Sequence, residues 1–288
     1  MNGIVLINKP KGITSRDVVN KVSKKLGIKK IGHTGTLDPL ASGVLVLCIG
    51  SATKVSELLT SLEKEYIAEV YLGIQTETLD ITGNILKEEE VNTSEEEIKE
   101  VLSSFIGRYM QEVPIYSAVK VNGKKLYEYA RNNEEVELPK KEVEIKQIEM
   151  LDNLFLKDNH WCFKFKCLVS KGTYIRSLIR DICDRLGICG TMLNLIRTKQ
   201  GKFNIDDCIS IEDVGEDSIV DIKSYLDLPS VEIDEYLYNK IINGQILENK
   251  YGVSKIMFIY NNEVIAIYEE YQKDKKKIKP YCMLGGKI

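Results

Sequence analysis

Short apolar runs, each stopped by glycine, proline or asparagine, alternate irregularly with amphipathic helical segments along this chain. In a βαβ repeat every strand is followed by a helix, and the sheet that results is parallel. Here some strand-like runs follow one another directly, which favours a mixed α+β sheet over a Rossmann fold. The predicted strands are residues 3–8, 44–49, 66–72, 143–151, 161–169 and 193–198. One predicted helix spans residues 53–62, and others begin near residues 15, 94, 125 and 173. Residues 28–43 and 73–83 are predicted loops, and residues 238–245 are one of several short, mainly β elements near the C-terminus.

Helix-capping signals support this assignment. A serine or threonine before an apolar-periodic segment and a glycine after it are typical of helix starts and stops. The pairs of start and stop are Thr14 or Ser15 with Gly27, Ser94 with Gly107, and Gly172-Thr173 with Gly187. Residues 143–151 and 161–169 alternate in the manner of two antiparallel strands. The acidic stretch 206–227 looks like a connector to a small, mainly β module of about 50 residues.

Composition excludes several classes of protein. The chain has 288 residues, of which 43% are hydrophobic, and a formal net charge of −3, so it is not a disordered chain. Apolar runs such as Val44–Ile49 are too short to span a bilayer, and the first residues lack the layout of a signal peptide. Seven cysteines, odd in number and never spaced as CxxC, indicate reduced thiols. We therefore expect a soluble, cytoplasmic protein.

The small net charge conceals three basic blocks. Residues 1–60 hold nine Lys/Arg against three Asp/Glu, residues 164–202 hold nine against two, and residues 273–288 hold six Lys against one Asp. Residues 61–112 carry the opposite excess, with 13 acidic and four basic side chains. The basic blocks either meet on one electropositive face, as binding of a polyanion requires, or lie as solvated charge on unrelated faces.

The segment from Gly32 to Gly43 is the first candidate for chemistry. Its three glycines, one proline and two threonines rule out a regular helix or strand, and Asp38 lies at its centre. Loops held by rigid elements often carry catalytic groups, but Asp-Pro is also a common way to open a turn. The segment is not a P-loop, because the Gly-Lys-Ser/Thr ending is missing.

A second candidate is the segment from Ser170 to Arg176. A strand passes through Gly172 into a helix, so that backbone donors, Lys171 and Arg176 suit a phosphate or carboxylate. The alternative is an ordinary surface arginine on a helix whose Tyr174 fills the core.

Other kinds of catalytic site have little support. The two histidines and the cysteine spacings do not fit a metal site, and no serine or cysteine has the surroundings of a nucleophile. An aspartate is the best nucleophile available.

Six strings of residues, in order along nearly the whole chain, resemble the TruB family of bacterial tRNA pseudouridine-55 synthases. These are Lys9-Pro-Lys-Gly-Ile-Thr-Ser15, Gly32-His-Thr-Gly-Thr-Leu-Asp-Pro39, Lys64-Glu-Tyr66, Pro114-Ile-Tyr-Ser-Ala118 with Gly123-Lys-Lys-Leu-Tyr-Glu-Tyr-Ala-Arg131, Ser170-Lys-Gly-Thr-Tyr-Ile-Arg176 and Leu195-Ile-Arg-Thr198. The resemblance implies conversion of uridine to pseudouridine at position 55, in the T loop of tRNA, without metal or organic cofactor.

The resemblance also implies a role for each matching residue. Asp38 matches the catalytic nucleophile, Arg176 the arginine that pairs with it, and Tyr66 the tyrosine that stacks on the target base and helps to move a proton. Base flipping needs such aromatic and apolar walls, because the flipped base must be restacked in the pocket. Further contacts with the flipped nucleotide are implied for His33, Tyr174 and Leu195.

The family fold implied is a mixed, largely antiparallel sheet flanked by helices and loops, with a PUA-like RNA-binding domain. We assign residues 1–230 to the catalytic domain and 231–288 to the PUA-like domain, and residues 124–141 to an insertion that grips tRNA. The expected partner is the T stem-loop of tRNA, with no obligate protein partner and a monomeric state. The alternatives are a guide-RNA-dependent, dyskerin-like enzyme and a non-catalytic protein that binds or folds tRNA.

Overall fold

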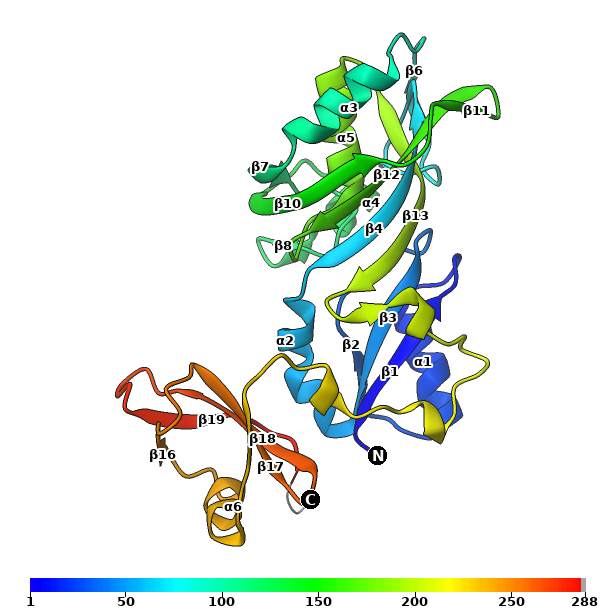
Figure 1. Cartoon of the computed structure of the whole chain (residues 1–288). Coiled ribbons are helices and arrows are strands. Elements are labelled where there is room, and N and C mark those ends of the chain that lie inside the picture. Colours follow the sequence, from blue (N-terminus) through cyan, green and yellow to red (C-terminus); the bar gives the residue numbers. More distant parts are fainter. Residues whose placement is uncertain (286–288) are drawn as a thin grey trace.

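One ten-stranded sheet organises most of the chain in this computed structural model, which describes residues 1–285 (Figure 1). Its main strands run in the order β1, β3, β13, β4, β12, β10, β7, while β2, β14 and β11 pair with β3, β13 and β12. β3 and β13 are parallel, and the other neighbouring strands are antiparallel, so the mixed and largely antiparallel sheet is confirmed. The strands are β1 Gly3–Lys9, β2 Ile31–His33, β3 Ser42–Ile49, β4 Lys64–Leu72, β7 Gly107–Glu112, β10 Lys140–Met150, β11 Phe155–Lys157, β12 His160–Val169, β13 Gly190–Gln200 and β14 Phe203–Asn204.

The two faces of β1 and β3 belong to different cores, because successive side chains of a strand point to opposite faces. Val5, Ile7 and the odd-numbered residues from Leu45 to Ile49 are buried with three helices, α1, α3 and α5. Ile4, Leu6 and the even-numbered residues from Val44 to Cys48 are buried with η1, α2 and part of the C-terminal module. These elements are α1 Ser15–Leu26, η1 Gly50–Val55, α2 Ser56–Thr60, α3 Glu95–Ser104 and α5 Ile175–Leu186.

The C-terminal module is a second, five-stranded sheet in the order β15, β17, β18, β19, β16, with one helix, α6. Figure 1 shows it as a separate lobe beside η1 and the N-terminus. Lys54 of η1 donates a hydrogen bond of 2.8 Å to the carbonyl of Met283, which links the two lobes. This small β-rich module agrees with the PUA-like domain expected from the resemblance. Its elements are β15 Ser230–Glu232, α6 Glu235–Ile242, β16 Leu247–Glu248, β17 Lys255–Tyr260, β18 Glu263–Glu270 and β19 Lys277–Met283.

Several local predictions need correction. The helix expected over residues 53–62 is a 3-10 turn, η1, followed by the five-residue α2, because no side chain caps either start. The two loops expected at 28–43 and 73–83 each contain a short strand, β2 and β5. Segment 238–245 of the C-terminal module lies mostly in α6, which Asp234 caps by accepting from the Leu237 N–H at 2.8 Å. The short elements beside the site are β5 Ile74–Thr76, β6 Ile85–Glu88, β8 Lys120–Val121, β9 Lys124–Lys125 and α4 Leu126–Arg131.

The division of the chain into residues 1–230 and 231–288 stays a prediction. The first strand of the second sheet, Ser230–Glu232, begins at this boundary, and residues 286–288 lie outside the described part of the chain. Within residues 1–285, no helix is long and apolar enough to cross a membrane.

Candidate active site

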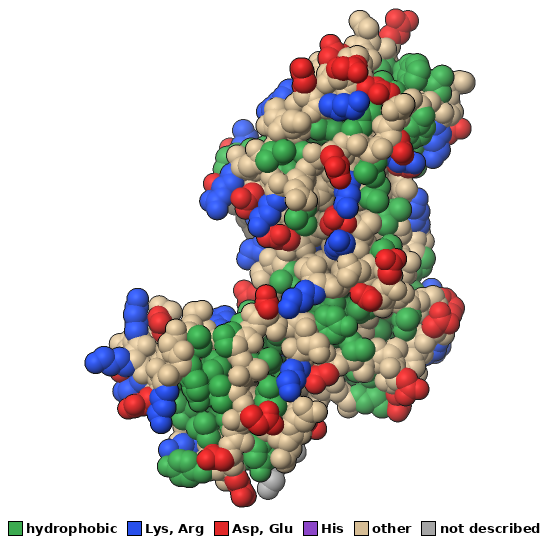
Figure 2. Space-filling view, in the orientation of Figure 1, with side chains coloured by type: hydrophobic (Ala, Val, Ile, Leu, Met, Phe, Trp, Pro, Cys, Tyr) green, Lys and Arg blue, Asp and Glu red, His purple; other side chains and the backbone are tan. Residues whose placement is uncertain are grey.

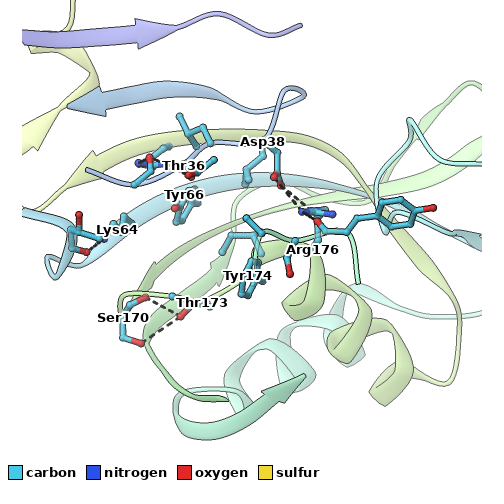
Figure 3. A pocket seen from close by; sticks show the side chains of 18 of the residues that line it. Thr36, Asp38, Lys64, Tyr66, Ser170, Thr173, Tyr174 and Arg176 are labelled. Carbon is cyan, nitrogen blue, oxygen red and sulfur yellow. Dashed lines mark hydrogen bonds and ion pairs between the residues drawn. The ribbon is translucent and has the colours of Figure 1, made fainter. Parts of the chain in front are cut away.

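A cavity of about 440 Å³ opens where β4 and β13 meet the loop after β2 and the start of α5. Asp38, Tyr66, Tyr174, Arg176 and Leu195 line it, so five of the six predicted site residues share one space. Figure 3 shows Asp38 and Arg176 facing each other on one side, with Tyr66 and Tyr174 nearby. The folding of the chain thus joins the two segments that the sequence singled out, 32–43 and 170–176.

His33, the sixth predicted residue, is not among the lining residues. It ends β2, and its Nδ1 accepts a long hydrogen bond of 3.4 Å from the N–H of Gly35. Burial, and to a lesser degree Arg16 and Arg197, lower the pKa of His33 below its usual value, which favours the neutral ring. His33 therefore contacts the backbone leading to Asp38, and its contact with a nucleotide stays a prediction.

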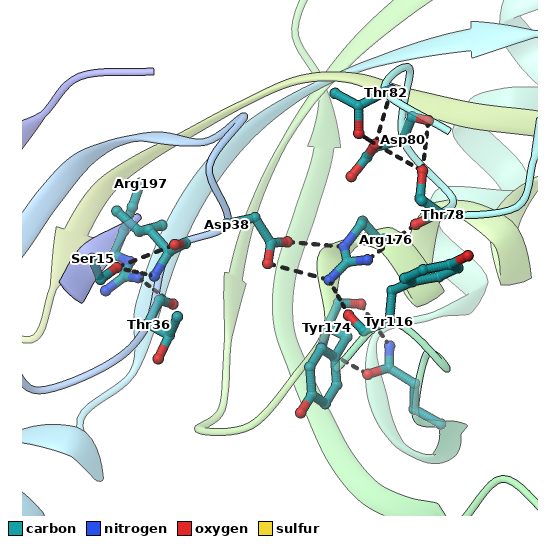
Figure 4. Close-up of polar contacts among 12 residues, drawn as sticks. Ser15, Thr36, Asp38, Thr78, Asp80, Thr82, Tyr116, Tyr174, Arg176 and Arg197 are labelled. Atoms are coloured by element: carbon teal, nitrogen blue, oxygen red, sulfur yellow. Dashed lines mark hydrogen bonds and ion pairs between the residues drawn. The ribbon is translucent and has the colours of Figure 1, made fainter. Parts of the chain in front are cut away.

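Arg176 holds Asp38 with two hydrogen bonds. Its Nε lies 2.9 Å from one carboxylate oxygen of Asp38 and its Nη2 lies 3.2 Å from the other. The remaining donors reach the carbonyls of Thr78 at 3.0 Å and Tyr116 at 3.1 Å (Figure 4). The Arg176 side chain is only 6% exposed, whereas Asp38 is 34% exposed to the cavity. The alternative of a surface arginine is therefore wrong, because Arg176 lies under the carboxylate that it pairs with.

Backbone contacts fasten the segment that carries Asp38. The Ser15 hydroxyl accepts from the N–H of Leu37 at 2.9 Å and donates to the Leu37 carbonyl at 3.1 Å. The N–H of Gly12 donates to the carbonyl of Pro39 at 2.8 Å. The contacts come from the first residue of α1 and from the turn after β1, so the Lys9–Ser15 string holds the chain on each side of Asp38.

Two buried residues of β13 hold the other end of the same segment. The Arg197 guanidinium donates to the carbonyls of Gly35 at 3.3 Å and Thr36 at 3.1 Å. The Gln200 amide donates to the Thr34 carbonyl at 3.0 Å and to its hydroxyl at 2.7 Å, and accepts from Arg197 at 3.1 Å. The irregular backbone is thus paired along its length, as buried backbone groups must be.

Tyr66 lies in the floor of the cavity on β4. In the strand register it pairs with Cys167 of β12 and with Arg197 of β13, and it is 8% exposed. The Arg197 guanidinium carbon is 5.7 Å from the centre of the Tyr66 ring. Burial raises the pKa of the Tyr66 phenol, and the nearby Arg197 charge acts in the opposite direction. Burial likewise raises the pKa of Tyr174, so both rings are neutral surfaces on which a base can stack.

Three buried cations around the cavity escaped the sequence reasoning. Arg197 and Lys9 are 1% and 0% exposed and Lys64 is 7% exposed. Across residues 1–285 none of the three lies within ion-pair distance of a carboxylate; each binds backbone carbonyls instead. All three belong to the strings of residues that resemble the TruB family. Their position within or at the end of an apolar strand is the sequence signal that could have predicted their burial. Lys64 and Arg197 line the cavity, whereas Lys9, from the first basic block, does not, so the meeting of the basic blocks on one face stays a prediction.

The face of the molecule in Figure 2 carries Lys/Arg and Asp/Glu side chains intermixed. No continuous basic area appears on that face. Ionic partners account for part of this mixture, since Lys164 and Lys166 of the second basic block pair with Glu69 and Glu65 of the acidic segment.

The Asp80 turn supports Arg176 and was also missed. One Asp80 carboxylate oxygen accepts from the Thr78 hydroxyl at 2.9 Å and from the Thr82 N–H at 3.0 Å. Leu79, between them, has a positive φ of 61°. This turn places the Thr78 carbonyl that accepts from Arg176, so Asp80 acts on the site through the backbone.

No group of three or more His, Cys, Asp and Glu side chains in the described residues is placed to hold a metal ion.

Comparison with known proteins gives the family. The model of the TruB family pseudouridylate synthase N-terminal domain matches residues 23–175. The chain belongs to the TruB family of pseudouridylate synthases. The matched TruB region contains Asp38 and Tyr66 and ends one residue before Arg176.

Curated relatives match almost end to end. The tRNA pseudouridine synthase B of Caldanaerobacter subterraneus is 44% identical and covers 93% of this chain and 94% of its own length. That of Alkaliphilus oremlandii is 45% identical, over 94% of this chain and 91% of its own length. Among solved structures, a Cbf5–Nop10–Gar1 complex has a chain that is 25% identical with a TM-score of 0.71, covering 99% of this chain and 84% of that one. The TruB family fold therefore extends over both lobes.

Proposed function

We propose that this protein isomerises uridine to pseudouridine at position 55 in the T loop of tRNA. The observation that carries the proposal is the Asp38–Arg176 pair, with hydrogen bonds of 2.9 and 3.2 Å, in the wall of a cavity that also contains Tyr66 and Tyr174. The relatives at 44 and 45% identity are named tRNA pseudouridine synthase B, which supports tRNA as the substrate.

Asp38 is the nucleophile in this proposal. The Arg176 guanidinium fixes the direction of the Asp38 carboxylate through two hydrogen bonds, and a carboxylate held in this way can attack as a nucleophile. Asp38 attacks either the sugar or the base and forms a covalent intermediate. The bond between the ring nitrogen of the base and the sugar carbon breaks. The base then rotates and rejoins the sugar through C5, and the carboxylate leaves. The C5 proton is lost and the ring nitrogen gains one, so the reaction is an isomerisation with no other reactant.

The cavity walls serve base flipping. Removing a uridine from its stack costs roughly a few kcal/mol, which restacking in the pocket must offset. Tyr66, Tyr174 and Leu195 offer that surface, and Tyr66 is proposed to help move the proton during rearrangement. His33, which accepts from the Gly35 N–H at the start of the segment that carries Asp38, is proposed to make a further contact with the flipped nucleotide.

The proposed tRNA grip, residues 124–141, contains α4 and the chain to β10. Lys124 lies 4.6 Å from the Tyr129 ring centre, and Lys125 and Arg131 lie 5.3 and 5.4 Å from that of Tyr127. Tyr127 also lines the cavity. Interleaved cations and aromatic rings of this kind suit phosphates and unpaired bases.

The deciding experiment maps pseudouridine in unmodified tRNA after incubation with the pure protein. We expect modification at position 55 by wild type and none by Asp38→Asn. Asp181→Asn is the matched control, because Asp181 also pairs with an arginine, Arg180, but lies outside the cavity. Substantial turnover by Asp38→Asn at normal tRNA affinity would overturn the assignment.

The same experiment separates the alternatives. A guide-dependent, dyskerin-like enzyme would be inactive without guide RNA and partner proteins, and the Cbf5 neighbour was indeed solved with Nop10 and Gar1. A non-catalytic tRNA-binding or tRNA-folding protein would retain all biological function as Asp38→Asn. We propose a cytoplasmic monomer that needs no protein partner, with a C-terminal module that adds RNA contacts; light scattering of the pure protein, with and without tRNA, tests the monomeric state.

A further inference from the structure

The cavity has a second end, away from the Asp38–Arg176 pair. Its walls there are Gly35, Thr36, Thr60, Lys64, Ser170 and Arg197. In Figure 3, Tyr66 lies between this end, marked by Lys64, and the side that holds Asp38. The charges of Asp38 and Arg176 satisfy each other, whereas the charges at the Lys64 end have no such partner.

Lys64 has an unused donor. Its ammonium donates to the carbonyls of Thr60 at 2.5 Å and Leu62 at 2.7 Å, at the end of α2. An ammonium has three N–H donors, so one is left over. The residue is only 7% exposed and lines the cavity, so a group bound in the cavity can reach the ammonium.

The charged neighbours of Lys64 are themselves cations. The pKa of Lys64 is lowered from 10.5 to about 8. Burial is the largest cause, and the nearby charges of Arg197, Lys171 and Lys141 act in the same direction. None of these four residues forms an ion pair within residues 1–285. A buried charge surrounded by like charges is unfavourable in the free protein, and an anion would relieve it.

Arg197 supplies an independent observation. Its Nη donors are paired, but its Nε is buried without a hydrogen-bond partner in the described structure. A Cβ at Gly35 would lie 3.4 Å from Arg197 Nη1 and 3.8 Å from Lys64 Cε, so both cationic side chains lie beside the same glycine. An unpaired donor of a buried charged group is unfavourable, and an anion in the cavity would stabilise the guanidinium through its charge.

We infer that the Lys64 end of the cavity is a subsite for one backbone phosphate of the RNA strand next to the target uridine, with Lys64 as its direct ligand and Arg197 behind it. The inference rests on the proposed function, because an RNA strand that brings its uridine to Asp38 must carry a phosphate on each side of it. Ser170 and Thr36 offer hydroxyls in the same wall. Two lining cations, Lys64 and Arg197, with no carboxylate among the walls of this end, fit a phosphodiester better than a neutral base or sugar.

The test is a double-mutant cycle between protein and RNA. Synthetic T stem-loops carry a single uncharged methylphosphonate at each position flanking the target uridine, and their Kd is measured with wild type and Lys64→Met. We expect Lys64→Met to weaken binding of unmodified RNA about tenfold or more, as expected for a charged hydrogen bond. One methylphosphonate should weaken wild type similarly and leave Lys64→Met unchanged.

Lys146→Met is the matched control. Lys146 pairs with Glu63, the residue before Lys64, and does not line the cavity. This variant should show the full methylphosphonate penalty at every position. Lys64→Arg, which keeps the charge, should also keep the penalty, and Lys64→Gln replaces Lys64→Met if that variant does not fold.

Equal penalties in wild type and in the neutral Lys64 variant at every flanking position would overturn the inference. The cycle is run in the Asp38→Asn background, so affinity is read without turnover and this failure is distinct from failure of the proposed function. Absence of pseudouridine from the wild-type reaction would overturn the function while leaving the binding cycle readable.

Discussion

Asp38 and Arg176 are 138 residues apart in the chain and meet through two hydrogen bonds, of 2.9 and 3.2 Å, between a carboxylate and a guanidinium fork. Two further donors of Arg176 bind the carbonyls of Thr78 and Tyr116. The guanidinium is therefore fixed from three other segments of the chain before any substrate arrives. A carboxylate held in this way needs no reorganisation to act, which is the condition for efficient catalysis by positioning.

Replacement of Arg176 by lysine tests this fork. Lysine keeps the charge but cannot make two parallel bonds to Asp38 and still reach both carbonyls. We expect kcat for pseudouridine formation to fall about 10- to 100-fold, the equivalent of one or two charged hydrogen bonds. Arg180→Lys is the control, since Arg180 lies on the same helix and pairs with Glu112 and Asp181 outside the cavity. If Arg176→Lys were as active as the control Arg180→Lys, the two parallel hydrogen bonds to Asp38 would not be needed for catalysis.

The sequence predicted those parts of the fold whose signals are local. The capping box of Thr14 and the left-handed Gly27 bound α1 as expected, because both depend only on neighbouring residues. The buried state of Arg176 depends instead on carbonyls at residues 78 and 116, which no local pattern indicates. Lys64 and Arg197 were missed for the same reason, since their burial follows from the pairing of β4 with β13.

The Asp80 turn offers a test of a positioning residue outside the cavity wall. Asp80→Ala removes the acceptor of the Thr78 hydroxyl and the Thr82 N–H, which frees the carbonyl of Thr78 from its place under Arg176. We expect kcat to fall about tenfold while KM for tRNA changes little, a loss of about 1.4 kcal/mol in transition-state stabilisation. Glu77→Gln, in the same loop but paired only with Asn84, should behave as wild type. A rise in KM alone would contradict the positioning role.

Gly43 tests the close approach of β3 to β13. Its φ is +101°, and a Cβ there would overlap the backbone of Arg197. We expect Gly43→Ala to lower the free energy of unfolding by at least about 3 kcal/mol, from backbone strain and overlap together. Gly107→Ala is the control, because Gly107 has a φ of +113° with open space around it and should lose only about 1–2 kcal/mol. Urea unfolding measures the free energy of unfolding of both variants. Equal losses would mean that backbone strain accounts for the whole effect and that the overlap with Arg197 adds nothing.

The burial of Lys9 leads to a prediction of how the free energy of unfolding depends on pH. It is fully buried, and its ammonium donates to the carbonyls of Pro10 at 2.9 Å and Ile13 at 2.8 Å. Burial lowers the pKa of Lys9 from 10.5 to about 8, with Asp38 opposing and Arg197 adding to the shift. Because the folded pKa lies below the unfolded one, the unfolded chain binds more protons between pH 8 and 10.5, and the cost of the buried charge fades as pH rises through that window.

Urea unfolding of wild type and Lys9→Met at several pH values isolates this group, since all other titrations are shared. The unfolding free energy of wild type should rise relative to the variant between pH 8 and 10.5, by at most about 1.4 kcal/mol per pH unit, and the difference should be constant below pH 7. Lys11→Met, from an exposed position in the same turn, is the matched control for the loss of one lysine. A difference between wild type and Lys9→Met that does not change with pH would mean that the buried ammonium keeps its ordinary pKa, and that its carbonyl ligands fully replace water.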